Sequence, residues 1–148
     1  MRFMIMVRSV PEFEAEPTPR PDEAMFAAMA AFHEELARAG VLLDASGLQP
    51  SRLGWRIQYG PEGQRVVDGP FAESKELIAG YTLISARSRD EALEWSRRFP
   101  NPVGEGQPAM IEVRQLFELD DFGDSPGLER FRRIDLPGQS AERRGSHP

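Results

Sequence analysis

The stretch Val66–Tyr81, VVDGPFAESKELIAGY, decides the fold of this 148-residue chain because it separates a hairpin from the next main strand. Upstream of it, GWRIQY and QRVV alternate apolar and polar residues around GPEG, which predicts a β-hairpin. The sequence DGPF interrupts this alternation, since glycine and proline favour a turn. A new run of apolar residues predicts a strand from Leu77 to Ala86.

A strand, a helix and a second strand are predicted on the N-terminal side of the hairpin. Within residues 2–8, the unbroken apolar run from Phe3 to Val7 is typical of a strand that is covered on both faces. Asp22 is placed to cap a helix over residues 23–39, whose apolar side chains recur at spacings of four and three. The sequence VLLDASGL after Gly40 predicts the second strand.

The C-terminal side repeats this order of elements. Ser88 and Glu91 fit the capping box of a second helix that Pro100 ends, and AMIEVRQLF predicts the last strand. Two split βαβ halves with an inserted β-hairpin predict an α+β fold, a ferredoxin-like βαββαβ sandwich, over residues 1–117. Residues 118–148, rich in Asp, Gly, Pro, Arg and Ser, are predicted to be an extension that is partly disordered or docks on a partner subunit.

Composition and charge exclude several classes of function. The chain has no cysteine, so disulfides and thiolate chemistry are absent. A net charge of −6 argues against a nucleic-acid surface, which depends on Lys and Arg. No apolar run reaches the roughly 18 residues of a membrane span, and a cytoplasmic protein is expected. Neither metal-ligand spacing nor a phosphate-binding glycine loop is evident, so we expect no metal and no cofactor.

One face of the predicted sheet lacks a cover, because both helices pack on the other. Strand alternation assigns a mixture of apolar and charged side chains to this uncovered face. They are Met4, Met6 and Arg8 from the first strand, and Met110, Glu112, Arg114 and Leu116 from the last. The mixture is too apolar for a bare surface and too charged for a dry core. We therefore predict a homodimer in which two sheets face each other across a cavity.

The motifs DGPFAESKE with GY after it, AGVLLDASGLQP before it and EALEW beyond it resemble the DGPF group of the YCII-related family, over residues 1–117. This resemblance implies a dimeric α/β barrel, similar in scaffold to muconolactone isomerases and small monooxygenases. It also implies a regulatory setting, since some members of the group lie beside genes for extracytoplasmic-function sigma factors. The wider family has a first-helix histidine proposed to work with an aspartate. The matching turn here is near Met29, and His33 lies one turn later, so that pair is not carried over.

Three residues are candidates for acid–base chemistry. His33 lies at the border of the apolar stripe of its helix, where an imidazole acts as a general base or packs at the boundary. Asp68 heads the DGPF turn, where it either caps backbone N–H groups or faces the mouth of the cavity as an acid or base. Glu73 follows the turn and is the third candidate.

Ligand-binding candidates gather on the predicted uncovered face and beside the turn. Glu112 and Arg114 project to this face together, and Arg8 is placed to join them. They form either an ion pair across the dimer or an anion site for a carboxylate ligand. Lys75 is a further candidate contact, with structural ion pairs as the alternative. Phe71 is expected to anchor the turn, and Trp55 and Tyr81 are candidate aromatic walls of the site.

Three functions are consistent with these features. The first is a homodimer that binds a small molecule without chemistry of its own. The second is a cofactor-independent enzyme that uses Asp68, His33 or Glu73 for proton transfer in the cavity between the sheets. The third is a protein–protein interaction module whose basic tail docks an acidic partner.

Overall fold

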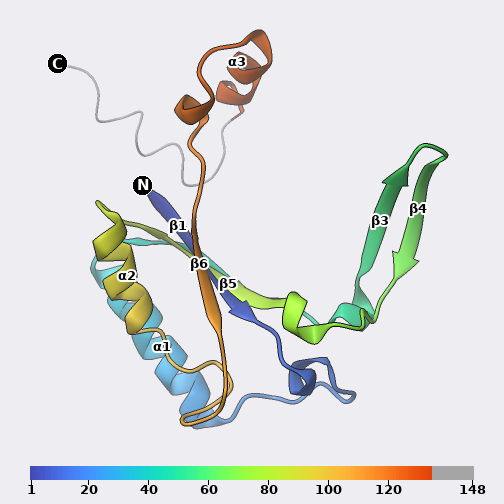
Figure 1. The fold of residues 1–148 in the computed structure, drawn as a ribbon. Helices are drawn as coiled ribbons and strands as arrows, with labels where there is room; N and C mark the ends of the chain where they lie inside the picture. The colour runs from blue at the N-terminus through green and yellow to red at the C-terminus, as the bar shows by residue number, and fades with distance from the viewer. Residues whose placement is uncertain (135–148) are drawn as a thin grey trace.

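The computed structural model describes residues 1–134, which build one four-stranded antiparallel sheet with two helices on one face (Figure 1). The strand order is β2-β5-β1-β6, and each neighbouring pair is antiparallel. This order, with a helix after β1 and another after β5, is the ferredoxin-like arrangement that the sequence predicts. The strands of the sheet are β1 (Arg2–Arg8), β2 (Leu42–Gly47), β5 (Ile78–Ser85) and β6 (Ile111–Gln115).

Both predicted helices begin at the expected caps. The Asp22 carboxylate accepts a hydrogen bond from the backbone N–H of Met25 at 2.8 Å, and α1 runs over Glu23–Arg38. The Ser88 hydroxyl accepts from the N–H of Glu91 at 3.1 Å, and α2 runs over Arg89–Arg97. The predicted capping box is only half formed, because the Glu91 carboxylate accepts from the N–H of Arg87 instead of Ser88.

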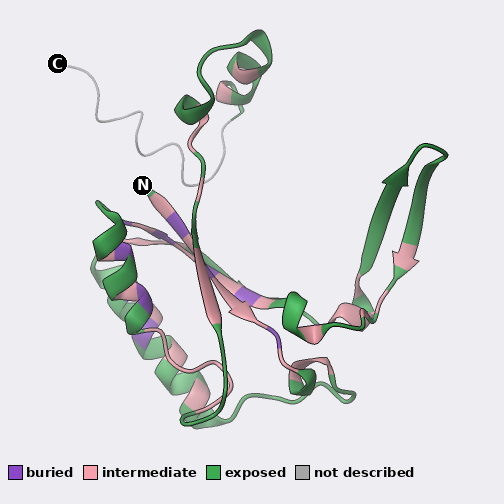
Figure 2. Cartoon of the chain, in the orientation of Figure 1, coloured by how far each residue is buried: buried purple, intermediate pink, exposed green. Residues whose placement is uncertain are grey.

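The core lies between the sheet and the two helices. Ile5, Leu36 and Ile84 have no solvent exposure and join β1, α1 and β5. The rings of Phe32 and Phe99 pack edge to face, with centroids 5.3 Å apart, so that Phe99, just after α2, packs against the core. Figure 2 shows the buried residues concentrated on these facing surfaces. Burial of this kind is the main force that holds the helices to the sheet.

The inserted hairpin is a separate two-stranded sheet that projects from the body (Figure 1). It consists of β3 (Trp55–Gly60) and β4 (Gly63–Asp68) and is followed by the DGPF turn. The N–H of Gly69 donates to the carbonyl oxygen of Gly54 at 3.0 Å, and the Gly69–Pro70 peptide bond is cis. The turn therefore closes the base of the hairpin and, as the sequence predicts, lies between the hairpin and the next main strand.

The glycine of the DGPF turn is required by a close backbone approach. A Cβ at Gly69 would lie 1.8 Å from the carbonyl oxygen of Ser51, in the short 3₁₀ segment Ser51–Leu53. The φ of Gly69 is not in the left-handed region, so the close approach of the Ser51 carbonyl, and not an unusual backbone angle, requires glycine here. The predicted anchor Phe71 is half-buried, and the Arg56 guanidinium lies 3.7 Å from its ring centroid.

The chain after β6 forms a small C-terminal arm, residues 117–134, that stands apart from the hairpin (Figure 1). It contains a 3₁₀ segment at Leu119–Phe122 and the helix α3 (Pro126–Arg132). The Arg2 guanidinium holds its base through the Glu118 carboxylate, with Nε–Oε1 at 2.9 Å. Residues 135–148 of the predicted extension lie outside the described residues. Within residues 1–134, no helix has the length and apolar character that crossing a membrane requires.

Candidate functional site

An open cavity of about 600 Å³ lies between α1 and the edge of the sheet formed by β2 and β5. Two glycines, Gly47 and Gly80, are cross-strand partners at the bottom of this cavity, and the absence of side chains at both positions leaves space above the sheet. A Cβ on Gly80 would approach the carbonyl oxygen of Ser46 at 3.0 Å, so a side chain at this position would crowd β2. The walls that α1 supplies are mainly apolar, from Met25, Phe26, Met29 and Ala30.

A hydrogen-bonded pair, His33 and Thr82, is part of the polar lining of this cavity, which also includes Thr18, Ser46 and the predicted aromatic wall Tyr81. His33 Nε2 lies 2.9 Å from the Thr82 hydroxyl, and His33 Nδ1 lies 2.7 Å from the carbonyl oxygen of Met29. A carbonyl oxygen can only accept, so Nδ1 carries the hydrogen, and in the neutral ring Nε2 accepts from Thr82. The rings of Phe32 and Phe99 meet the imidazole edge to face and fix its plane.

The pair offers a defined chemistry to a bound molecule. Thr82 is 2% exposed on the helix-facing side of β5, at the cavity wall. Its hydroxyl donates to His33 and keeps lone pairs that can accept from an O–H or N–H of a ligand. A hydrogen bond from the ligand to Thr82, together with the hydrogen bond from Thr82 to His33, makes a path for a proton from the ligand to the imidazole. The site can therefore recognise a donor group at one end of a mainly apolar molecule.

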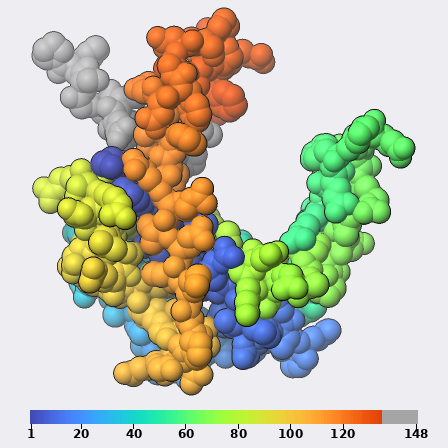
Figure 3. Space-filling view, viewed as in Figure 1, coloured from blue at the N-terminus to red at the C-terminus, as the bar shows by residue number. Residues whose placement is uncertain are grey.

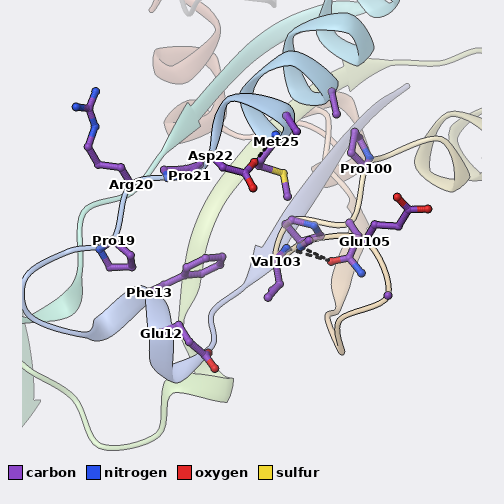
Figure 4. A pocket seen from close by; sticks show the side chains of 16 residues that line it. Glu12, Phe13, Pro19, Arg20, Pro21, Asp22, Met25, Pro100, Val103 and Glu105 are labelled. Atoms are coloured by element: carbon purple, nitrogen blue, oxygen red, sulfur yellow. Dashed lines mark hydrogen bonds between the residues drawn. The ribbon is translucent and has the colours of Figure 1, made fainter.

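A second open cavity, of about 820 Å³, lies beside the first at the N-terminal end of α1 (Figure 4). Phe13, Met25 and Pro102 line both cavities, so the two adjoin. Figure 4 shows Phe13 and Met25 directed into the space and Arg20 directed away from it. The loop on the far side is held by the Asn101 side chain, whose Oδ1 accepts from the N–H of Val103 at 3.0 Å and whose amide donates to Gln107.

Three of the predicted ligand contacts do gather, on the opposite side of the sheet. The Arg8 guanidinium lies 3.4 Å from one Glu112 oxygen, and that of Arg114 lies 3.5 Å from the other. Arg8 also donates to the carbonyl oxygen of Lys75 at 2.6 Å. We call this side the open face. It is formed by Met4, Met6 and Arg8, by Asp44 and Ser46, by Tyr81 and Leu83, and by Glu112 and Arg114.

Tyr81 lies on the open face, where its hydroxyl donates to the Asp44 carboxylate at 2.9 Å. The hydrogen bond to Asp44, followed by the negative charge of that carboxylate, raises the pKa of Tyr81 above its ordinary value of 10.0. The phenol therefore stays neutral at physiological pH and acts as a donor held in place.

The remaining predicted residues are dispersed over the surface. Asp68 and Glu73 are exposed, and each lies apart from the cavity that His33 lines. Lys75 is exposed and contributes its carbonyl, and Trp55 is 65% exposed on the hairpin. The three candidates for acid–base chemistry do not share one cavity in this chain. His33 lies on the helix side of the sheet, opposite the face where the sequence placed an inter-sheet cavity.

Sequence reasoning did not find Thr82 or the cavity beneath α1. The available signal was the pair of glycines inside the second and third main strands, since glycine within a strand often marks a close approach of a ligand or another backbone. The pairing of Gly47 with Gly80 follows from the strand register. Among the side chains of residues 1–134, no group of three or more His, Cys, Asp or Glu is arranged to hold a metal ion.

Comparison with known proteins identifies the family. The family model of the YCII-related domain matches residues 1–120. An uncharacterized protein of Rhizobium meliloti (strain 1021) is 34% identical over 95 residues, which span 64% of this chain and 75% of that protein.

A solved structure is similar over 79% of this chain and 94% of its own, at 15% identity and a TM-score of 0.39. It is 5-chloro-2-hydroxyhydroquinone dehydrochlorinase from Burkholderia phenoliruptrix AC1100, in complex with 2,5-dihydroxybenzoquinone. Because the domain model covers most of the chain, this protein belongs to the YCII-related family.

Proposed function

We propose that this protein is a homodimer that binds a small, mainly apolar molecule in the cavity beneath α1, with the His33–Thr82 pair contacting its polar group. The observation that carries this proposal is a hydrogen-bonded imidazole and hydroxyl at the wall of an apolar cavity of about 600 Å³. Cavities of this size and lining, with few polar groups, are typical of small-molecule sites.

The support for the dimer is the composition of the open face. Met4, Met6 and Leu83 lie there beside the linked charges of Arg8, Glu112 and Arg114. A second sheet placed against this face would bury the thioethers and leucine and retain the ion pairs. Sedimentation velocity tests it: the expected species has twice the mass of the 16.6 kDa chain, and a monomer at micromolar concentration would contradict it.

The ligand site is tested with a matched pair of probes, 2-naphthol and naphthalene, which differ by one hydroxyl. We expect the protein to bind 2-naphthol about fivefold more tightly, since one hydrogen bond contributes about 1 kcal/mol. Thr82→Val, which keeps the shape and removes the hydroxyl, should abolish this preference. Ser85→Ala, which alternation places on the opposite side of the same strand from Thr82, is the control and should keep it. An unchanged preference in Thr82→Val would refute the assignment.

A second candidate function is a cofactor-independent acid–base enzyme. Its support is the 2.9 Å separation of His33 Nε2 and the Thr82 hydroxyl, which suits proton transfer. Deuterium exchange at the acidic carbon of 2-indanone, followed by NMR, tests it. We expect exchange that is lost in both His33→Gln and Thr82→Val, and equal exchange in the wild type and both variants would exclude this role.

The physiological setting that we infer is regulatory, in association with a sigma-factor system. Its support is the resemblance of the DGPF stretch, residues 68–71, to that group. Loss of sigma-factor-dependent transcription in a host that lacks this chain is the expected result, and unchanged transcription would contradict the inference.

A further inference from the structure

One face of the inserted hairpin is apolar and uncovered. Trp55, Ile57 and Tyr59 alternate along β3 and so share a face, and Val66 is the cross-strand partner of Ile57. Their exposed fractions are 65%, 42%, 77% and 61% in chain order. We call these four side chains the hairpin patch. A two-stranded ribbon is marginally stable alone, so a surface that covers this patch would also hold the hairpin in place.

The C-terminal arm carries four further exposed apolar side chains. The side chains of Phe117, Phe122, Phe131 and Ile134 are exposed by 73%, 58%, 56% and 52%. The rings of Phe117 and Phe122 are in contact, with centroids 4.8 Å apart. We call these four side chains the arm patch. Figure 2 shows most of the arm and most of the hairpin in the colour of exposed residues.

The hairpin and the arm stand apart within one chain. Figures 1 and 3 show them rising on either side of a wide gap, with the body of the sheet at the base of the gap. Each arises at a different edge of the sheet: the hairpin follows β2, and the arm follows β6, at opposite ends of the strand order. A partner that lies against the sheet would therefore sit between both projections.

We propose that the hairpin patch of one subunit packs against the arm patch of a second copy of this chain. A two-fold axis through the sheet-to-sheet contact would form two such junctions at once, each pairing unlike patches. Both apolar surfaces are present on one chain, on projections that follow the two edge strands of the same sheet, which favours a second copy over a foreign protein. The inference rests on the proposed dimer and specifies how its two projections are covered.

The exposed area agrees with a stable dimer. An aromatic side chain has about 150–250 Å² of surface, of which 56–77% is exposed in these patches. With the exposed part of the isoleucine and valine side chains added, each patch offers about 500 Å². Soluble monomers rarely expose more than a few hundred Å² of contiguous apolar surface. Two junctions would bury about 2,000 Å² in total, at the upper end of the usual range for specific interfaces, before the contact between the sheets is included.

The natural absence of cysteine makes a direct test possible. We would mix two single variants, Tyr59→Cys on the hairpin and Phe131→Cys on the arm, and allow disulfides to form under mild oxidation. The control replaces Tyr59→Cys with Gln58→Cys, whose side chain projects from the opposite face of β3. All three positions are exposed, so circular dichroism should show unchanged folding.

We expect the Tyr59→Cys and Phe131→Cys pair to cross-link at least tenfold faster than the control pair. In an independent measurement, Tyr59→Asp should weaken the dimer at least thirtyfold, as expected for a buried tyrosine at an interface. A dimer that cross-links equally with both hairpin positions would overturn the junction and leave the dimer itself intact. A chain that sediments as a monomer would overturn both the junction and the proposed dimer.

Discussion

Replacing Gly69 with alanine is the sharpest test of how the DGPF turn works. The added Cβ would lie 1.8 Å from the Ser51 carbonyl oxygen and 2.6 Å from its carbonyl carbon, whereas real Cβ atoms essentially never come within 3.0 Å. The Ser51 backbone cannot yield freely, because its N–H donates to the Glu14 carboxylate at 2.8 Å and its hydroxyl donates to the same group. The turn must therefore move away by about 1 Å.

That movement has a cost that follows from the contacts of the turn. It stretches the hydrogen bond from Gly69 N–H to Gly54 O, at 3.0 Å, and that from Phe71 N–H to the Ser51 hydroxyl, also at 3.0 Å. Two hydrogen bonds are worth about 2 kcal/mol, and residual overpacking adds about 1–2 kcal/mol. The reduced entropy of the unfolded chain returns about 0.5 kcal/mol. We expect a net loss of about 3 kcal/mol in the free energy of unfolding.

The assay is urea unfolding followed by circular dichroism at one fixed protein concentration. Amide hydrogen exchange at Phe71 reports any part of the loss that is local to the turn. Gly60→Ala in the same hairpin is the matched control, because a Cβ there meets nothing within 4 Å and its φ is ordinary. If Gly69→Ala loses less than about 1 kcal/mol relative to this control, and Phe71 stays protected, the close-approach explanation is wrong.

Three further predictions follow from other parts of the chain. Leu36→Ala removes a side chain with no solvent exposure and should cost about 2–5 kcal/mol of unfolding free energy in urea. Ser88→Ala removes the cap of α2 and should cost about 1 kcal/mol in the same assay. In Tyr59→Phe, Tyr81 is the sole tyrosine and should titrate above pH 10.0 by ultraviolet absorbance, with Asp44→Asn moving the midpoint down. Because the pKa of Tyr81 is raised in the folded protein, the stability from its hydrogen bond to Asp44 is present below pH 10 and is lost as the pH rises through the folded pKa. Equal titration midpoints for Tyr81 with and without the Asp44 carboxylate would contradict this explanation.

Features that depend on local sequence were predicted well. The starts of both helices follow from Asp22 and Ser88, because a cap is set by backbone N–H groups three residues away. The grouping of Arg8 with Glu112 follows from alternation in two strands that pair directly in the sheet. In each case the relevant distance along the chain is short, or the period of a strand is enough to assign the face.

The cavity beneath α1 could not be predicted in the same way. His33 and Thr82 are 49 residues apart in the chain, and their contact requires α1 to lie across β5 at one particular height. The sequence predicts a role for His33 in a cavity between two sheets. His33 lies instead on the helix side of the sheet, because α1 packs on that face. The placement of Asp68 and Glu73 on the exposed surface follows from the projection of the hairpin, which no local pattern encodes.

By itself, the sequence determined the order of strands and helices, the DGPF turn that closes the hairpin, and which strand residues share a face, because these depend on spacing and turn chemistry. Only the tertiary structure decided why residue 69 must be glycine, since the Ser51 carbonyl that approaches it belongs to a separate segment. It alone also decided that Gly47 pairs with Gly80 to leave space beside His33, because volume in a fold arises from the register of distant strands and the packing of a helix above them.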